Sequence, residues 1–254
     1  VYKRQVSIGY LCAKTNQGTN SIALGSSSGN INQGNEAIAI GLNSGYNNQG
    51  LNSISIGSLT GNISQGNNSV AIGNSAGENL QLEQSVAIGF QAGQYSQGLK
   101  SISIGSLSGN NSQGNNSVAI GNLAGENLQS EESIAIGNQA GQYSQGLKSI
   151  SIGAKAGQTN QQNNTIAIGF EAGNNYQDIA SIAIGYQAGY TTQGIDSVSI
   201  GDQAGYAKQG TLAIAIGASA GYSTQNDLAI AIGWNAGYQS PVSYTHLRAH
   251  ETLR

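Results

Sequence analysis

Few side chains in this chain combine the residue type and the spacing that catalysis or metal binding requires. Both histidines, His246 and His250, lie within the last nine residues, and Cys12 is the single cysteine. The four aspartates each occupy a different position of the repeat described below, so they form no column of carboxylates. Glu78 and Glu126 do match in position, but they belong to near-identical copies of one 48-residue stretch. The sequence therefore predicts a protein that is not an enzyme and has no catalytic, metal-binding or cofactor-binding residues.

Four tyrosines are the one set of side chains whose spacing suggests a contact site. Tyr190, Tyr206, Tyr222 and Tyr238 recur at every sixteenth position. If each interval is one turn of a stacked structure, their rings lie roughly 5 Å apart in a stripe. Two interpretations follow: the rings stack on one another and stabilise an exposed face, or they form a contact strip for sugar or protein.

The elements that position these residues follow from one regular spacing. Fifteen glycines, from Gly9 to Gly233, occupy every sixteenth position without an insertion or deletion, and we number each repeat from this glycine as position 0. All 38 glycines of the chain fall at positions 0, +4 or +9, as expected where bends need positive φ or a close approach of backbones. A fixed short period predicts a solenoid in which each turn contacts its neighbours.

A glutamine column accompanies the glycines. Position +8 is glutamine in every repeat, from Gln17 to Gln225. Stacked amides can bond to one another and to the carbonyls of a buried bend, so the column predicts an internal ladder. The alternative is a polar binding stripe on the surface.

Each glycine at position 0 follows an alternating segment such as Ser69-Val70-Ala71-Ile72, which is typical of a β-strand. We expect the aliphatic residues at −3 and −1 to point inward, and Ser and Ala to point outward. The small residues at +3 are expected to pack where the coil is narrow, and the variable residues at +1 and +2 are expected to face outward. The fold class predicted is all-β, a parallel β-solenoid or β-roll of about 15 coils, one for each 16-residue repeat.

The composition changes at both ends of the chain. Residues 1–5 and 241–254 contain all the arginines, both histidines and the single proline. Both segments resemble translated transposon adapters from shotgun DNA sequencing, so we expect scars there, with 241–254 disordered, around one solenoid domain at 6–240. The chain contains no methionine, which indicates an internal fragment of a longer protein assembled from environmental DNA.

Low charge limits the classes of partner. Charged residues make up 8% of the chain, against about 25% in typical domains, and its formal net charge is −3. Nucleic acid is not an expected partner, because no basic stripe is present to bind phosphates. No apolar run reaches the ~20 residues of a membrane helix, so no membrane contact is expected of this segment. Small polar residues at low charge favour an extracellular fibre.

Two segments carry a resemblance to a known family. Asn68-Ser69-Val70-Ala71-Ile72-Gly73 and the equivalent run ending at Gly121 resemble the head-domain repeat of trimeric autotransporter adhesins. The resemblance implies a left-handed parallel β-roll, a homotrimer, display on a bacterial cell surface in virulence, and binding to extracellular matrix or to a host-surface protein or glycan. The repeat here is longer than the family's by a Gln-Gly bend. Similar repeats also occur in viral and phage fibre proteins.

The function expected from the sequence is that of an extracellular structural or adhesive shaft or head segment. The alternatives are a viral or phage tail-fibre segment, located on a virion, and an ice-binding solenoid. Ice binding usually needs a regular array of hydroxyl groups, and the threonines here follow no column. The sequence does not identify the ligand.

The regular period yields a direct test. Amide hydrogen exchange should show protection that recurs once per repeat, over the Ile-Ala-Ile strands, because those amides bond to neighbouring turns. Exchange followed by mass spectrometry would measure this pattern. A helical circular dichroism spectrum would contradict it.

Overall fold

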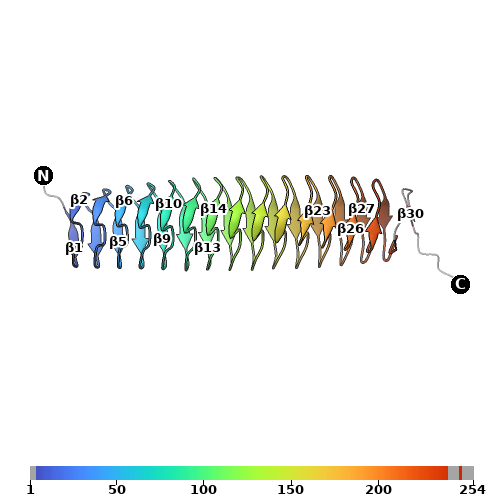
Figure 1. The fold of residues 1–254 in the computed structure, drawn as a ribbon, viewed down its shortest axis with the longest axis horizontal. Helices are drawn as coiled ribbons and strands as arrows, with labels where there is room; N and C mark the ends of the chain where they lie inside the picture. Colours follow the sequence, from blue (N-terminus) through green and yellow to red (C-terminus); the bar gives the residue numbers. More distant parts are fainter. Residues whose placement is uncertain (1–3, 240–245, 248–254) are drawn as a thin grey trace. The chain divides into compact units, whose positions relative to one another are not determined.

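The computed structural model describes residues 4–239 and 246–247, and their regular secondary structure is entirely β-strand. Each repeat contributes two short strands joined by two bends, and the strands stack into two parallel sheets (Figure 1). The fold is a parallel β-solenoid of about 14 turns with a spacing of ~16 residues, as the sequence predicts. The chain divides into two units, Val1–Glu132 and Ser133–Arg254.

In the first unit, one sheet is built from the Ile-Ala-Ile segments, and we call it the Ile sheet. The other ends each strand on the recurring glutamine, and we call it the Gln sheet. The strands of the Ile sheet are β1 (Val6–Ile8), β3 (Ile22–Leu24), β5 (Ile38–Ile40), β7 (Ile54–Ile56), β9 (Val70–Ile72), β11 (Val86–Ile88), β13 (Ile102–Ile104) and β15 (Val118–Ile120). Those of the Gln sheet are β2 (Thr15–Gln17), β4 (Ile31–Gln33), β6 (Asn47–Gln49), β8 (Ile63–Gln65), β10 (Asn79–Gln81), β12 (Tyr95–Gln97), β14 (Asn111–Gln113) and β16 (Asn127–Gln129).

The second unit repeats the same two sheets. Its Ile sheet contains β17 (Ile134–Ile136), β19 (Ile150–Ile152), β21 (Ile166–Ile168), β23 (Ile182–Ile184), β25 (Val198–Ile200), β27 (Ile214–Ile216), β29 (Ile230–Ile232) and β30 (His246–Leu247). Its Gln sheet contains β18 (Tyr143–Gln145), β20 (Thr159–Gln161), β22 (Tyr176–Gln177), β24 (Thr192–Gln193), β26 (Lys208–Gln209) and β28 (Thr224–Gln225).

The two end segments fall largely outside the described residues. Of residues 1–5, the structure describes residues 4 and 5, and the Gln5 amide donates to the Gln17 carbonyl at 2.5 Å. Of residues 241–254, it describes only β30, which pairs in parallel with β29 through Ala231 opposite His246. The predicted scars and disorder otherwise concern residues that the structure does not describe.

Pairing between turns has no offset. Val86 of β11 lies opposite Val70 of β9 on one side and opposite Ile102 of β13 on the other. Bends follow the same rule, because Gly29 N donates to Ser44 O of the next turn at 2.9 Å. Each residue thus stacks on the equivalent residue of the turn before and the turn after, and an insertion in one turn would break bonds to both neighbours.

The interior is the reverse of what the strand pattern led us to expect. Ala71 is fully buried, whereas Val70 and Ile72 on either side of it are half-buried on the outer face. Every buried apolar residue among those described is alanine, at −2, at +3 or, in a few turns, at −4. The prediction that the aliphatic residues point inward is therefore wrong, whereas the small +3 residues, such as Thr60 and Ala76, are fully buried in the narrow interior.

The physical reason is the width of the interior. A period-2 pattern shows that a strand has two different faces, but it does not show which face is covered. Across from the Ile-sheet strands β3 to β27 lie the buried glutamines of the Gln sheet, such as Gln81, which is 0% exposed. The glutamine fills most of the gap between the sheets, so close packing leaves room only for alanine or serine opposite it.

Two kinds of glycine hold the bends close together. At Gly25, φ is +127°, and an added Cβ would lie 2.6 Å from the carbonyl oxygen of Gly41 in the next turn. At Gly45, φ is +53°, and a Cβ would lie 2.7 Å from Oε1 of Gln49 inside the turn. The first clash would separate turns and the second would displace the glutamine, so both positions require glycine.

The Gln sheet changes its local shape within the second unit. Up to Asn160, the residue at +7 has positive φ, as Asn160 itself does at 52°. From Tyr176 onward this residue is an ordinary strand residue, and Thr192 N donates to Ala207 O at 3.1 Å. The +7 residue is Asn, Ser or Leu in the left-handed turns and Tyr, Thr or Lys in the later turns, so the residue type changes together with the local geometry.

The presence of alanine inside and isoleucine outside can be tested by substitution. Substituting Ala87→Val should lower the free energy of unfolding by about 1 to 3 kcal/mol, because the interior has no space for two further methyl groups. The control Ile88→Val, on the outer face of the same strand, should cost less, since solvent replaces the lost group. Urea denaturation of the two variants measures both. A larger loss for Ile88→Val would contradict this orientation of the strand.

Candidate functional site

The glutamine column is internal. Gln81 Nε2 reaches across the turn to donate to the backbone oxygens of Val70 at 2.9 Å and Ser85 at 3.4 Å. Some glutamines also bond to the next turn, as Gln33 Nε2 does to Gln49 Oε1 at 3.1 Å. From Gln33 to Gln225, every glutamine of the column is 0 to 3% exposed. The internal ladder is confirmed, and these amides are not a surface stripe for a ligand.

The strand residue at −2 decides whether the glutamine oxygen has a partner. Where this residue is serine, from Ser55 onward, its hydroxyl donates to Oε1 of the glutamine in the same turn at 2.6 Å, as Ser55 does to Gln65. Where it is alanine, five of these buried oxygens accept no hydrogen bond; they belong to Gln33, Gln81, Gln97, Gln193 and Gln225. Each is an unsatisfied acceptor in a closed interior, which costs stability.

The four predicted tyrosines form a continuous stack in the second unit. Ring centroids are 5.0 Å apart for Tyr190 and Tyr206, 4.9 Å for Tyr206 and Tyr222, and 4.8 Å for Tyr222 and Tyr238. Interplanar angles are 4° to 7°. The predicted stacking is confirmed. Because the ring faces cover one another, a sugar that stacks on an aromatic face would find free faces only at the two ends.

The surroundings of the stack affect its phenols. The pKa of Tyr206 is raised above its usual value, first by burial and then by the neighbouring phenols Tyr190 and Tyr222, with smaller effects from Glu171 and Tyr186. Burial and negative charge nearby both disfavour a phenolate at Tyr206, so its surroundings favour the neutral form of this phenol.

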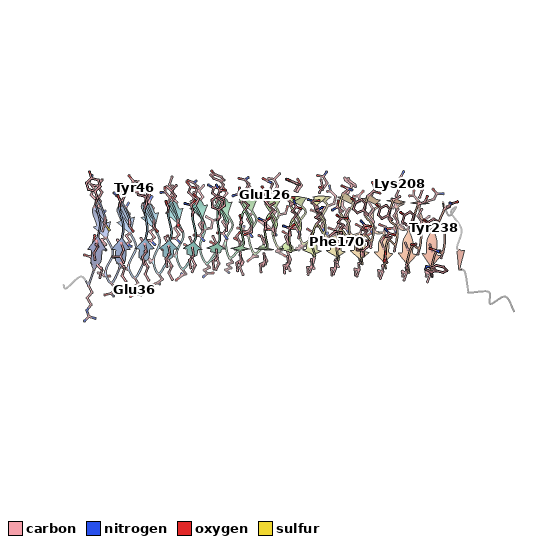
Figure 2. All side chains as sticks on the ribbon, turned by 90° about the horizontal axis from the view of Figure 1, so that it is seen from below. Glu36, Tyr46, Glu126, Phe170, Lys208 and Tyr238 are labelled. Carbon is pink, nitrogen blue, oxygen red and sulfur yellow. The ribbon has the colours of Figure 1, made fainter. Side chains whose placement is uncertain are left out.

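A second ring pair and a polar ladder belong to the same unit. Phe170 and Tyr186, at +1 in successive turns, stack with centroids 5.4 Å apart and planes at 11°. Beside them at +2, Glu171 accepts a hydrogen bond from Gln187 at 2.8 Å and forms an ion pair with Lys155 at 3.4 Å. Side chains of equal repeat position line up from turn to turn, as the sticks in Figure 2 show. Variable positions thus form ladders of their own on the outside.

The aliphatic columns at −3 and −1, which the sequence pattern predicted to lie inside, form a large surface on the outside. In the first unit, the residues at −3 and −1 of the eight Ile-sheet strands are all Ile, Val or Leu. They lie on the outer face of the Ile sheet, where Ile56 and Ile104 remain 36% and 37% exposed. The same two columns occur on β17 through β29 of the second unit, and none of these positions holds a charge. The alternation in the sequence predicted two different faces, but not which of them lies outside.

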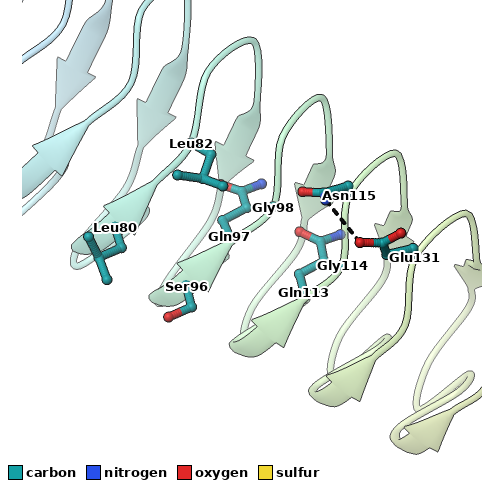
Figure 3. Close-up of a pocket in the computed structure, with 9 residues that line it drawn as sticks. All are labelled: Leu80, Leu82, Ser96, Gln97, Gly98, Gln113, Gly114, Asn115 and Glu131. Carbon is teal, nitrogen blue, oxygen red and sulfur yellow. Dashed lines mark hydrogen bonds between the residues drawn. The ribbon is translucent and has the colours of Figure 1, made fainter.

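A groove hollows the surface of the first unit (Figure 3). It has a volume of about 330 Å³ and runs over the turns that contain Gly98 and Gly114, between Leu82 and Glu131. The two glycines leave the space open, and Asn115 Nδ2 closes one end through a 3.0 Å bond to the Glu131 carboxylate. It contains no cluster of ionisable groups suited to catalysis.

Other candidate chemistries find no support in the described residues. Cys12 is half-buried, and its thiol donates to the Ala23 carbonyl at 3.0 Å, in the small +3 column. Among residues 4–239 and 246–247, no three His, Cys, Asp or Glu side chains gather where they could hold a metal ion. Within the same residues, no helix has the length and hydropathy to cross a membrane.

No protein-family model matches this sequence, and no curated protein matches it significantly.

Substitutions at position −2 test whether a serine hydroxyl there stabilises the buried glutamine oxygen. Ala71→Ser should place a hydroxyl against the unpaired Oε1 of Gln81 and raise the free energy of unfolding by about 0.5 to 1.5 kcal/mol. The matched change Ser55→Ala should lower it by a similar amount, because it removes the donor to Gln65. Chemical denaturation measures both. Equal effects of the same sign would show that the glutamine oxygens do not depend on this donor.

The column itself can be tested at Gln113. Gln113→Ala should cost about 1 to 3 kcal/mol, because it removes the acceptor of the Ser103 hydroxyl and the side-chain donor to the Ile102 carbonyl. Urea denaturation measures the loss. An unchanged denaturation midpoint would contradict the internal role.

Proposed function

We propose that this chain is a segment of an extracellular structural or adhesive shaft, without catalytic activity, whose copies associate through the outer faces of their Ile sheets. The observation that carries the proposal is the pair of uncharged aliphatic columns on those faces. Both the size and the shape of this apolar surface support an assembly of identical chains.

The size of the face favours a partner. A monomeric soluble protein rarely exposes a contiguous apolar patch larger than about 300 to 600 Å². In the first unit, eight strands each place two aliphatic side chains on one face, and the strands are neighbours in a single sheet. Stacking from turn to turn covers part of each side chain and leaves the outer part in water. A second apolar surface would remove that remainder from solvent.

The shape of the face favours further copies of the same chain. Its side chains repeat with the spacing of the turns, so an identical solenoid offers a matching row of ridges and grooves. A symmetric interface between copies also needs only one kind of patch on each chain. The resemblance to adhesin head repeats adds three as the number of copies, a bacterial surface as the location, and matrix or host-surface molecules as ligands.

A viral or phage fibre remains the runner-up, since it would use the same face in the same way. Ice binding receives less support. The outer face of the Ile sheet is aliphatic instead of hydroxylated, and the outer residues of the Gln sheet are mixed, for example Asn79, Tyr95 and Thr159. Within residues 4–239, neither face offers a regular array of hydroxyl groups.

Sedimentation equilibrium tests the proposal. At micromolar concentration the chain should have the mass of a trimer. The double substitution Ile102→Lys/Ile104→Lys should dissociate it, because charges brought together in an apolar interface cost several kcal/mol. The matched control Leu42→Lys/Phe90→Lys also exchanges exposed apolar groups, but at bend positions, where each side chain is 52% and 50% exposed. It should remain a trimer.

A clean monomer mass for the unmodified chain would overturn both the assembly and the adhesin function that depends on it. Dissociation by the bend control, but not by the strand variant, would move the interface to another face. Circular dichroism of each variant verifies that the solenoid is intact.

A further inference from the structure

The tyrosine stack holds four phenols in a geometry that is independent of any assembly between copies. Parallel pairing places Thr192 opposite Lys208 and Lys208 opposite Thr224. Tyr190, Tyr206 and Tyr222 each lie two residues before one of these strands. Tyr206 O accepts from Thr191 N at 3.0 Å, and Tyr222 O from Ala207 N at 2.9 Å. The backbone therefore fixes the column, and the rings do not depend on contacts outside it.

The rings are related almost by pure translation. With planes 4° apart and centroids 4.9 Å apart, each atom of the Tyr206 ring lies close to one turn spacing from its equivalent in Tyr222. The carbons beside the hydroxyl groups are among these equivalent pairs. Part of each ring reaches solvent, and Tyr238 is 41% exposed.

We propose that Tyr190, Tyr206, Tyr222 and Tyr238 are a site of oxidative modification, at which a one-electron oxidant couples tyrosines of adjacent turns into dityrosine. The oxidant is of the class of peroxidase intermediates formed with hydrogen peroxide, or a photo-oxidised metal complex. The product joins turns covalently along the outer surface of the second unit.

The coupling removes two electrons and two protons in all. Each of two phenols gives one electron to the oxidant and its hydroxyl proton to solvent, which leaves two tyrosyl radicals. A carbon–carbon bond forms between the ring carbons beside the two oxygens. Each coupled carbon then releases its hydrogen as a proton while a proton returns to each oxygen, which restores both aromatic rings. The oxidant accepts both electrons.

Adjacency distinguishes this column from the other tyrosines. Tyr95 and Tyr143 are 45% and 44% exposed, so an oxidant reaches them at least as easily. Neither has a stacked ring beside it among the described residues. A radical formed there has no phenol in the next turn with which to couple.

The experiment oxidises the full chain with a photo-excited ruthenium tris-bipyridine complex and persulfate. Dityrosine is measured by its fluorescence, and cross-linked peptides are identified by mass spectrometry. We expect cross-links within one chain that join Tyr190 to Tyr206, Tyr206 to Tyr222, or Tyr222 to Tyr238. Their yield per chain should not change on dilution.

The decisive variant is Tyr206→Phe/Tyr238→Phe. It keeps a ring at every position of the column but leaves the two remaining phenols two turns apart, roughly 10 Å. Dityrosine within the chain should be lost. The matched control Tyr95→Phe/Tyr143→Phe removes two exposed phenols and should keep the yield of the unmodified chain.

Three results would overturn the proposal: cross-links that map to Tyr95 or Tyr143, a yield that falls in proportion on dilution, or an unchanged yield in the Tyr206→Phe/Tyr238→Phe variant. Peptide mapping of the unmodified chain decides the matter even if that variant folds poorly. None of these outcomes depends on whether the chain forms a trimer.

Discussion

The narrow gap between the two sheets is the constraint on which the rest of the structure depends. Water is excluded from it, so the backbone carbonyls that point into it must find donors within the turn. Glutamine supplies them: Gln81 reaches Val70 and Ser85 with one amide nitrogen. Because a long side chain then occupies the gap, the opposite strand can present only alanine or serine, and the nearby bend must be glycine, as at Gly77, where a Cβ would meet the Gln81 amide oxygen at 2.7 Å.

A core of alanine, serine and glutamine buries little apolar surface, so stability has to come from other contacts. The in-register backbone ladder supplies bonds on both sides of each turn, in the bends as well as in the strands. On the outside, Ile stacks on Ile or Val at every turn and covers part of its own surface. Both contributions act between turns and not within one, which is the energetic pattern of a solenoid.

Positions outside the glutamine, alanine and glycine columns carry the variation that those columns cannot accept. At +5, the same place holds Asn110 in the first unit, bonded to the Gln91 carbonyl at 2.9 Å, and the stacked tyrosines in the second. At +7, the residue can be a left-handed asparagine or an extended threonine. The same type of side chain recurs at a given position in several successive turns and contacts its equivalents there. A change of residue type at one repeat position therefore produces a row of like side chains along the solenoid.

The sequence alone determined the period, the parallel stacking, the glycine bends and the columns themselves. These follow from spacing, because residues that recur at every sixteenth position must stack when each turn has the same length. The tyrosine stripe and the internal glutamines followed for the same reason. Only the tertiary structure decided which face of the Ile-Ala-Ile strand is inside. The alternation of Val70, Ala71 and Ile72 is equally regular from either side, and hydrophobicity favoured the larger residues for the core. The space that Gln81 leaves between the two sheets set the orientation instead, because it admits only a small side chain. This space depends on how two strands pack against each other, and the pattern within one strand does not reveal it.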